Sequence, residues 1–536
     1  MGNGLEGIIL LVGIIFIACI IFNKISNKIG VPVLLIFIVL GMLSGSDGIL
    51  KIDFSDYNYA NELCSTALIF IMFYGGFGTN WKSARPVAAP SILLSTVGVV
   101  VTALLTGAFC HYILNISWVE GMLIGSVISS TDAASMFSIL RSRSLNLKHN
   151  LASMLEVESG SNDPMSYMLT VIFLTLLSGQ QGNNYLFMII KQVGLGIGFG
   201  VAIAYLSFWV FKRIKFESIG LQEIFVIAIA LLGYALPSKF GGNGYLSVYI
   251  MGIILGNNDI PLKVEMFHFF DGITWIMQIL LFFVIGLLSF PSQLPSVLFV
   301  SLAIALFLTF VARPLAVFGV LSWFKLPFKR QLLVAWAGLR GAASIVFAMM
   351  AVVSNASMNT DIFHIVFCVA LISVALQGTL LPTLAKKLEL VDNSDSVLKT
   401  FNDYQEERVI NLIDFQVTED HKWSGKPLKE IELPNNLLVV MIKRENNIII
   451  PNGDTQIEAD DVLVMNSSAY IDNTDIPLYE LSINTDHPWA EQQLQNIDLP
   501  ENTLIIMIKR NNDLIVPKGD TILYAGDKII ANREIF

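Results

Sequence analysis

The sequence predicts a polytopic α-helical membrane protein with about thirteen spanning helices, followed by two small α+β domains. Hydrophobic residues make up 54% of the 536 residues, charged residues only 14%, and the mean hydropathy is +0.65. That is too apolar for an ordinary soluble protein. Apolar runs of near-spanning length recur as far as Ala385, and after Lys387 the composition becomes that of a soluble domain.

Hydropathy locates the expected spans to within a few residues. They are 5–23, 31–46, 60–79, 89–113, 118–140, 151–178, 185–211, 220–237, 243–257, 267–289, 296–320, 331–353 and 361–385. The second and ninth are short. The first run has no basic start and no small-residue cleavage site, so we expect it to be a retained helix.

Basic residues mark alternate loops. These loops are 24–28, 82–85, 141–148, 212–215, 263 and 325–330, whereas the intervening loops hold only Lys51 and Lys239. Because basic loops remain in the cytoplasm, we expect a protein of the cytoplasmic membrane with its N-terminus outside and its tail in the cytoplasm.

The charge balance separates the two parts of the chain. Lys and Arg number 19 against 16 Asp and Glu through Ala385, and 14 against 27 after it, so the tail carries −13. An acidic tail argues against a nucleic-acid partner. The four cysteines lie in apolar runs and the six histidines are scattered, so neither a metal site nor a cofactor is expected.

Several charged residues lie inside apolar segments, and four of them stand out: Asp132, Glu158, Asp163 and Arg340. A charge at the centre of a spanning helix costs roughly 2.5–3.5 kcal/mol, so such residues usually mark an ion path or an ion pair. Transport is therefore the leading hypothesis. An enzyme is not expected, because the sequence has no nucleophile–base pair, metal cluster or phosphate loop.

The sixth segment places polar side chains on one helical face. Glu158 and Asn162 are four residues apart, as are Ser159 and Asp163, so all four share a face. Carboxylate, amide and hydroxyl oxygens can replace part of the water around an alkali cation. Short polar residues at 129–132, and the GAAS that follows Arg340, favour unwound backbone. Interruptions in corresponding halves are typical of an inverted-repeat transporter with crossed, broken helices.

The segments ISSTDA, ESGSNDP and GLRGAAS resemble those of the NhaP/NHE-type monovalent cation/proton antiporters, and the resemblance covers roughly residues 5–385. It implies thirteen spans in two inverted repeats, divided into a core and a dimerisation domain, and hence a homodimer.

The resemblance also implies roles for individual residues. Asp163 would bind cation and proton in turn, and Asn162 would be its partner in an Asn-Asp pair associated with electroneutral exchange. Thr131 and Asp132 would belong to an unwound fifth span, and Ser159 would help to line the ion site.

The resemblance further implies a structural ion pair between Glu158 and Arg340, joining the sixth and twelfth spans. One position departs from the pattern: many relatives have Thr-Asp-Pro where this chain has Thr131, Asp132 and Ala133. That variant resembles the potassium/proton branch, which often carries cytoplasmic TrkA-C modules.

The tail contains a repeat with a constant offset of 66 residues: 433–455 matches 499–521. Its two copies resemble TrkA-C (regulator of K+ conductance, C-terminal) domains, and no GxGxxG motif for NAD accompanies them. The expected domains are an exchanger at 1–387, a linker at 388–404, and regulatory modules at 405–470 and 471–536.

Each module is expected to begin with a strand, near 409–417 in the first copy, followed by a helix near 424–431 and a hairpin that turns at Asn446 or Asn512. By resemblance such modules dimerise and bind small ligands, including cyclic di-AMP. The basic residues that follow one another in each hairpin are candidate anion contacts, although a solvated hairpin explains them as well. They are Lys443, Arg444, Lys509 and Arg510.

Together these features predict an antiporter that exchanges a monovalent cation for H+, with K+ favoured over Na+, electroneutral and regulated by its tail. A sodium/proton antiporter is the alternative. A ligand-gated cation channel is a further alternative, but it would need a TVGYG-like filter and pore-loop repeats, which the sequence does not contain.

Overall fold

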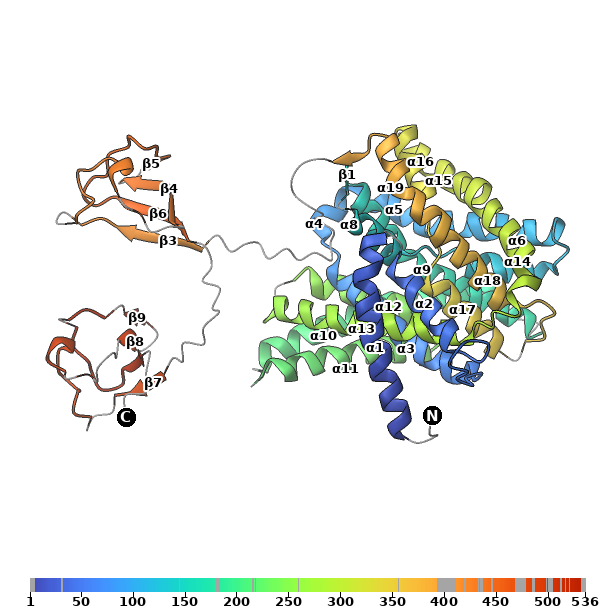
Figure 1. The fold of residues 1–536 in the computed structure, drawn as a ribbon, viewed down its shortest axis with the longest axis horizontal. Coiled ribbons are helices and arrows are strands. Elements are labelled where there is room, and N and C mark those ends of the chain that lie inside the picture. The colour runs from blue at the N-terminus through green and yellow to red at the C-terminus, as the bar shows by residue number, and fades with distance from the viewer. Residues whose placement is uncertain are drawn as a thin grey trace. The chain divides into compact units, whose positions relative to one another are not determined.

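The computed structural model divides the chain into two compact units, Met1–Gln405 and Glu406–Phe536. The first is built of helices and the second of strands (Figure 1). The structure describes residues 5–29, 32–143, 145–179, 184–214, 216, 218–258, 260–354, 356–392, 411–418, 421–431, 433, 437–444, 447–467, 479–483, 487–497, 499, 505–510, 513–515, 517–519 and 521–531.

The helices of the first unit follow the hydropathy of the sequence. They are α1 Leu5–Ile29, α2 Val33–Ser44, α3 Tyr57–Gly78, α4 Trp81–Ala84, α5 Ala88–Leu93, α6 Val99–Tyr112, α7 Trp118–Val127, α8 Ala133–Ser142, α9 Leu151–Leu177, α10 Tyr185–Arg213, α11 Ile219–Lys239, α12 Gly244–Gly256, α13 Lys263–Leu288, α14 Leu294–Phe307, α15 Arg313–Leu321, α16 Phe328–Trp336, α17 Ala342–Val353, α18 Ile362–Ile372 and α19 Thr379–Lys387. Every expected span overlaps described helix. Within the described residues, seven helical stretches are long and apolar enough to cross a membrane, so a count of thirteen stays a prediction.

Three of the long stretches contain a π-helical turn. The turns are Leu94–Gly98 between α5 and α6, Leu308–Ala312 between α14 and α15, and Ser373–Gly378 between α18 and α19. Helical backbone continues through each turn, so the helix pairs form single spans. π-Helical turns often accompany functional sites.

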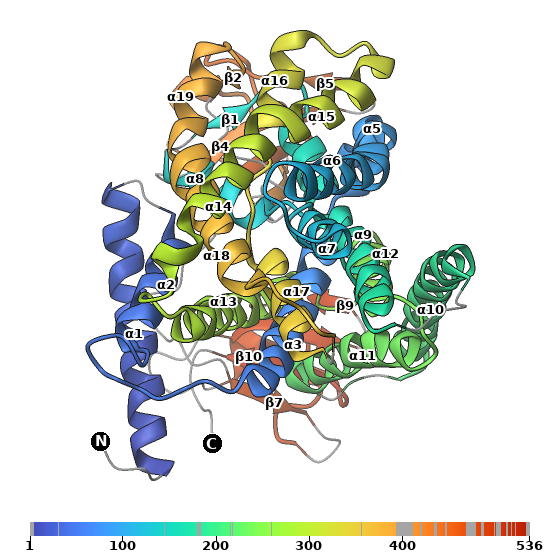
Figure 2. The same cartoon turned by 90° about the vertical axis from the view of Figure 1, so that its right-hand side faces the viewer.

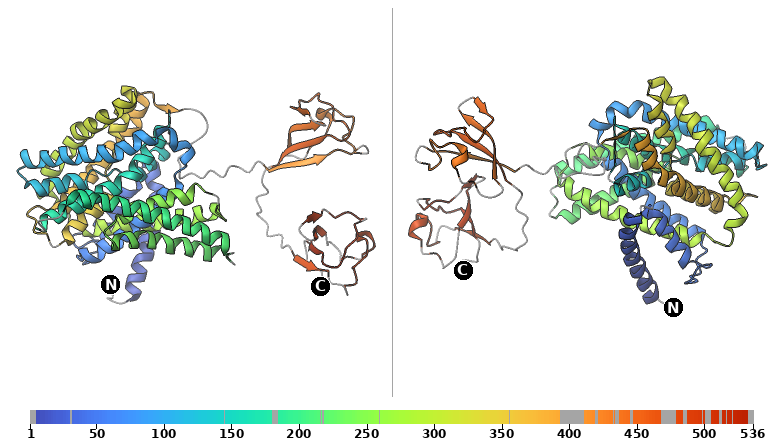
Figure 3. Two further views of the ribbon diagram at one scale, coloured as in Figure 1. Left: turned by 180° about the vertical axis from the view of Figure 1, so that it is seen from behind. Right: turned by 45° about the horizontal axis from the view of Figure 1, so that its top comes forward.

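The outer helices carry apolar side chains on their exposed faces. Phe187 and Trp209 of α10 are 62% and 55% exposed, and α10 and α11 lie side by side at one edge of the helical unit (Figure 2). The long helices pack alongside one another in the other views as well (Figure 3). Large exposed apolar faces suit contact with lipid or with another chain rather than with water.

Two helices are broken in the middle. The first break coincides with the short polar residues predicted to be unwound, whereas the second lies just before the predicted GAAS, whose last three residues begin α17. Residues 128–132 separate α7 from α8, and residues 337–341 separate α16 from α17. The two interruptions touch, because the backbone N–H of Asp132 donates to the carbonyl of Leu339 at 2.8 Å. The broken helices therefore cross inside the unit.

A short antiparallel pair closes one end of the helical unit. Strand β1 (Asn146–Leu147), in the loop between α8 and α9, pairs with β2 (Val391–Asp392), which follows α19. The N–H of Lys148 also donates to the carbonyl of Leu390 at 2.9 Å. The residues that follow α19 are thus hydrogen-bonded to the loop between α8 and α9.

Each tail module has one four-stranded antiparallel sheet. The first contains β3 Asn411–Gln416, β4 Leu437–Arg444, β5 Asn447–Ile449 and β6 Val462–Ser467 in the order β3-β6-β4-β5. The second contains β7 Tyr479–Ser482, β8 Ile505–Arg510, β9 Asp513–Ile515 and β10 Lys528–Ala531 in the equivalent order β7-β10-β8-β9. The repeat seen in the sequence is thus a structural repeat.

The expected helix near 424–431 is wrong. The described residues of the first module form only a 3-10 turn there, Leu428–Glu430, and the tail is β-structured rather than α+β in its described parts. Gly425 has a φ of +80°, and Pro427 cannot donate within a helix. The predicted hairpin turns at Asn446 and Asn512 lie outside the described residues.

Two of the predicted anion contacts are engaged inside their own modules. Arg444 donates from Nε and Nη2 to the carboxylate of Asp461, both at 2.8 Å, and Arg510 does the same to Asp527 at 2.8 and 2.7 Å. Both aspartates are fully buried. Bidentate pairing uses the guanidinium fork, so each arginine has a structural role in its own module, and its role as an anion contact stays a prediction. Lys443 is exposed, and the side chain of Lys509 lies outside the described part of the chain.

We expect the Asp527→Asn substitution to loosen the second module alone. The hydrogen bonds from Arg510 lower the pKa of Asp527, so this carboxylate stabilises the folded module above the ordinary aspartate pKa, and the contribution is lost as the pH falls through the lowered folded-state pKa. At pH 7 its loss should cost about 1–3 kcal/mol. Hydrogen–deuterium exchange of the full-length protein should then speed up in β8 and β10 but not in β4 and β6. The reverse pattern is expected for Asp461→Asn, and equal protection of both modules in both variants would contradict the structural role.

Candidate functional site

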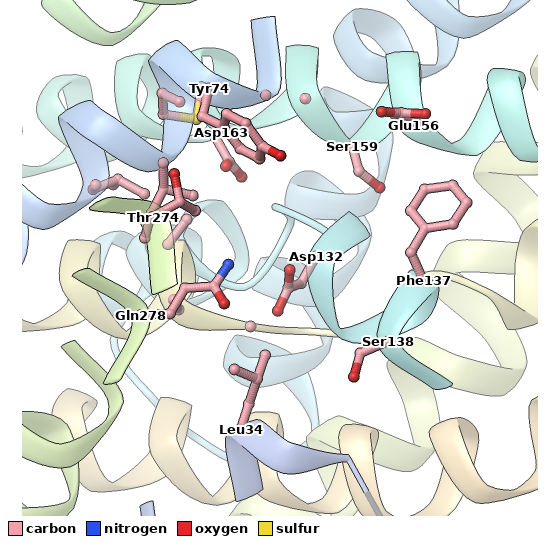
Figure 4. Close-up of a pocket in the computed structure, with 18 of the residues that line it drawn as sticks. Leu34, Tyr74, Asp132, Phe137, Ser138, Glu156, Ser159, Asp163, Thr274 and Gln278 are labelled. Atoms are coloured by element: carbon pink, nitrogen blue, oxygen red, sulfur yellow. The ribbon is translucent and has the colours of Figure 1, made fainter. Parts of the chain in front are cut away.

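A cavity of about 520 Å³ lies where the two helix interruptions meet α9 and α13. It brings together Thr131, Asp132, Ser159 and Asp163, four of the five residues that the sequence predicts at the cation site. Figure 4 shows the carboxyl groups of Asp163 and Asp132 at this cavity, on α9 and beside the first interruption. As cation ligands these residues remain a prediction.

Asp163 reaches the cavity from the middle of α9. It is partly buried, and its Oδ1 accepts a hydrogen bond from the hydroxyl of Ser130. None of the ion pairs in the described part of the chain includes it. A carboxylate that lies in the membrane interior without a basic partner favours a proton or a cation as its counter-charge.

Asp132 caps the helix that follows the first interruption. Its Oδ1 accepts from the N–H of Ser135 at 3.3 Å and its Oδ2 accepts from the Ser135 hydroxyl at 2.5 Å. A Cβ added at Gly341 would overlap the Asp132 carboxyl, so the start of α17 also lies beside it. One carboxylate thus faces the positive ends of two helices, α8 and α17.

Arg340 bridges the two interruptions, and its predicted pairing with Glu158 is wrong. Its Nη1 donates to the carbonyls of Ser129 and Ser130, both at 2.8 Å, and the Ser373 hydroxyl accepts from its backbone N–H at 3.1 Å. These carbonyls follow the C-terminal end of α7, where a cation is favoured by the helix dipole. Arg340 therefore donates hydrogen bonds to the carbonyls of unwound backbone and, among the described residues, not to a carboxylate.

The partner of Glu158 is Arg313, at the start of α15. Two parallel hydrogen bonds of 3.0 and 2.9 Å join them, and each side chain is only 1% exposed. A Cβ on Gly338 would lie 2.7 Å from Nε of Arg313, so the glycine makes room for the guanidinium. The sequence signal was the same for both arginines, a charge within an apolar segment, and could not decide between them.

Asn162 lies behind the cavity rather than on its wall. It is fully buried, and its amide donates to Thr131 Oγ1 at 2.5 Å and to Glu158 Oε1 at 3.4 Å. The Thr131 and Ser159 hydroxyls are 2.9 Å apart. Asn162 therefore positions the unwound residue Thr131 against α9, and it is not among the residues that line the cavity.

Other polar cavity residues did not stand out in the sequence. Glu156 of α9, Tyr74 of α3, and Asp271 and Gln278 of α13 all line the cavity. The signal for Asp271 was present, because it is a carboxylate inside the tenth apolar segment. In the described parts of the chain, no group of three or more His, Cys, Asp or Glu is placed to hold a metal ion.

Comparisons with known proteins cover both units. A family model described as "Sodium/hydrogen exchanger, transmembrane" matches residues 12–387, and a TrkA-C domain model matches 412–468 and 478–531. The chain is 34% identical over 463 residues to a protein named K(+)/H(+) antiporter NhaP from Alkalimonas amylolytica, covering 85% of this chain and 80% of that relative. It is 35% identical over 451 residues to one named K(+)/H(+) antiporter NhaP2 from Shewanella sp. (strain ANA-3), covering 83% and 78%.

A solved structure is also similar. The sodium proton antiporter MjNhaP1 from Methanocaldococcus jannaschii at pH 8 matches with a TM-score of 0.63 and 26% identity, covering 72% of this chain and 99% of that one.

The structure predicts that Glu158 is coupled to Arg313 and not to Arg340. Glu158→Gln should lower stability by about 3–5 kcal/mol, because it leaves a buried guanidinium without its counter-charge. Thermal unfolding of the purified protein in detergent would be measured for Glu158→Gln, Arg313→Gln, Arg340→Gln and the two double variants that contain Glu158→Gln. Strong non-additivity is expected only for the 158/313 pair, and coupling confined to the 158/340 pair would contradict the observed pairing.

Proposed function

Since the chain belongs to the sodium/hydrogen exchanger family, we propose that it exchanges a monovalent cation for H+ across the cytoplasmic membrane. It is a transporter rather than an enzyme. K+ is the favoured cation, because two relatives that are 34–35% identical are named K(+)/H(+) antiporters. Na+ is the second candidate, since the similar solved structure is that of a sodium proton antiporter.

One observation carries this proposal: Asp163 lies on a polar cavity in the membrane unit and forms no ion pair in the described part of the chain. A proton and a cation would compete for its carboxylate, since either one cancels the buried charge. The hydroxyls of Ser130, Thr131 and Ser159 lie at the same cavity. They would supply oxygen ligands to a partly dehydrated cation, and Asp132 would complete the site.

Of the carboxylates that the sequence singles out in the membrane unit, Asp163 is the one that would carry the exchanged charge. Glu158 is neutralised by Arg313, and Asp132 faces two helix N-termini. A cycle in which Asp163 carries either one monovalent cation or one proton is electroneutral. Alternating exposure of the cavity, with the broken helices and α9 moving against α13 and its neighbours, would prevent a leak.

The same proposal includes the wider architecture. It comprises thirteen spans, an outside N-terminus, a homodimer, an exchanger at 1–387, a linker at 388–404, and cytoplasmic regulatory modules at 405–470 and 471–536. The exposed apolar faces of α1 and α10 leave room for a second copy in the membrane. The loops with the clusters of Lys and Arg would face the cytoplasm.

We expect Asp163→Asn to abolish exchange. Proteoliposomes containing a pH-sensitive dye would report proton movement on addition of K+ or Na+. The wild-type protein should respond to K+ at lower concentration than to Na+, and the variant to neither, because the amide cannot alternate between a proton and a cation. A larger Na+ response would assign sodium/proton exchange, and normal exchange by Asp163→Asn would refute Asp163 as the carrier. Asp47→Asn, on the exposed loop after α2, serves as the control.

Regulation by the tail has a direct route to the cavity. Strand β2 begins the linker to the tail and pairs with β1, which lies between α8 and α9, the helices next to Asp132 and bearing Asp163. Lys329 Nζ also forms an ion pair with Glu389 Oε2 at 2.8 Å, two residues before β2. A ligand on the TrkA-C modules, with cyclic di-AMP as the candidate, would act by shifting β2 and, through the β1–β2 pairing, the loop between α8 and α9. Arg444 and Arg510, although paired within their own modules, stay candidates for contact with that ligand.

Lys148→Pro tests this route, because proline removes the backbone N–H that donates to the carbonyl of Leu390 beside the β1–β2 pair. In the full-length protein it should change the exchange rate in the same direction as deletion of 406–536, and it should have no further effect in the deleted protein. Lys148→Ala keeps this N–H and should behave as wild type. Additive effects of Lys148→Pro and the deletion would show that the pairing does not transmit the tail's influence. Both rates come from the dye assay at one K+ concentration.

A further inference from the structure

The cavity wall opposite the broken helices carries a stripe of polar side chains on α13. Asp271, Thr274 and Gln278 are three and four residues apart, so they share one helical face, and all three line the cavity. Figure 4 shows Thr274 and Gln278 on this wall, with the Gln278 amide extending toward Asp132. This stripe and Asp163 of α9 line the same cavity.

Asp271 is a carboxylate without a basic partner among the described residues. The hydroxyl of Tyr74, on α3, donates to its Oδ1 at 2.9 Å, and that donor is neutral. The residues that line the cavity include four carboxylates, Asp132, Glu156, Asp163 and Asp271, and no lysine or arginine. The electric field inside the cavity therefore attracts cations.

The hydroxyl of Thr274, unpartnered among the described residues, is a second indication of a ligand, independent of the charge of Asp271. Its side chain is 5% exposed, and its Oγ1 has no hydrogen-bond partner in the described part of the chain. A buried hydroxyl left unsatisfied costs free energy, about 1–3 kcal/mol. Gln278 is half-buried, and its amide oxygen is an acceptor of the kind that alkali cations bind. A carboxylate, a hydroxyl and an amide oxygen thus face one cavity from one helix.

Resting on the proposed exchange, we propose that Asp271, Thr274 and Gln278 form a second binding subsite for a monovalent cation, separate from the Asp163 site. Three oxygen ligands from a single helix face cannot replace the whole hydration shell of a cation, so the cation bound there keeps part of its water. The subsite holds the incoming cation and passes it across the cavity to Asp163. It therefore sets the apparent affinity for the cation, whereas Asp163 performs the exchange with the proton.

The test is the K+ dependence of proton movement in proteoliposomes containing the full-length protein. Asp271→Asn should raise the KM for K+ about tenfold with the maximal rate within about twofold of wild type, because the substitution removes binding rather than exchange. Thr274→Val, which keeps the shape and removes the hydroxyl, should raise the KM about threefold. Glu265→Gln is the matched control: Glu265 is an exposed carboxylate on the same helix and does not line the cavity, so its KM should be unchanged.

Each outcome decides the matter. An unchanged KM in Asp271→Asn, with Asp163→Asn inactive, would overturn the subsite and leave the proposed function intact. Activity in Asp163→Asn would instead overturn the proposed exchange site. If Asp271→Asn does not elute as a folded protein, Thr274→Val decides alone. The Thr274 hydroxyl makes no hydrogen bond among the described residues, so a purely structural role predicts unchanged or higher stability and an unchanged KM. An unchanged KM in Thr274→Val would therefore overturn the subsite.

Discussion

The membrane unit depends on satisfying unwound backbone deep inside an apolar environment. Two helices open at 128–132 and 337–341, and each freed N–H or C=O would cost several kcal/mol without a partner. Arg340 binds two of the freed carbonyls, and the N–H of Asp132 binds the carbonyl of Leu339 across the crossing. The crossing of the two helices follows from these bonds, because each interruption supplies what the other lacks.

The buried charges of the membrane unit are of two kinds, those with a fixed partner and those without one. Glu158 and Arg313 cancel one another through a bidentate pair, and Arg340 and Asp132 face helix ends of opposite sign. These charges hold the fold together. Among the described residues, Asp163 and Asp271 accept hydrogen bonds only from hydroxyls, and both lie on the cavity. Charges left without a fixed partner are those that can exchange ligands, and this division underlies both proposals about the cavity.

The tail modules are stabilised differently, because each is too small to bury a large hydrophobic core. Each module fixes its sheet with one buried aspartate and one arginine, Asp461 with Arg444 and Asp527 with Arg510. The pair recurs at the interval of the sequence repeat, and so does the sheet order. Within the helical unit, β2 follows α19 and pairs with β1 in the loop between α8 and α9.

The sequence by itself determined the elements whose causes are local. Apolar runs specified the helices, short polar residues specified the first interruption and located the second to within a few residues, and the 66-residue interval specified two equivalent modules. Helical spacing placed Ser159 and Asp163 on one face of α9, and both line the cavity. The tertiary structure decided the pairings, because Arg313 and Arg340 carry the same charge in similar apolar surroundings and only the crossing of the helices brings one of them to Glu158. It also turned Asn162 away from the cavity and placed Asp271 on the cavity wall, since those positions depend on how distant segments pack.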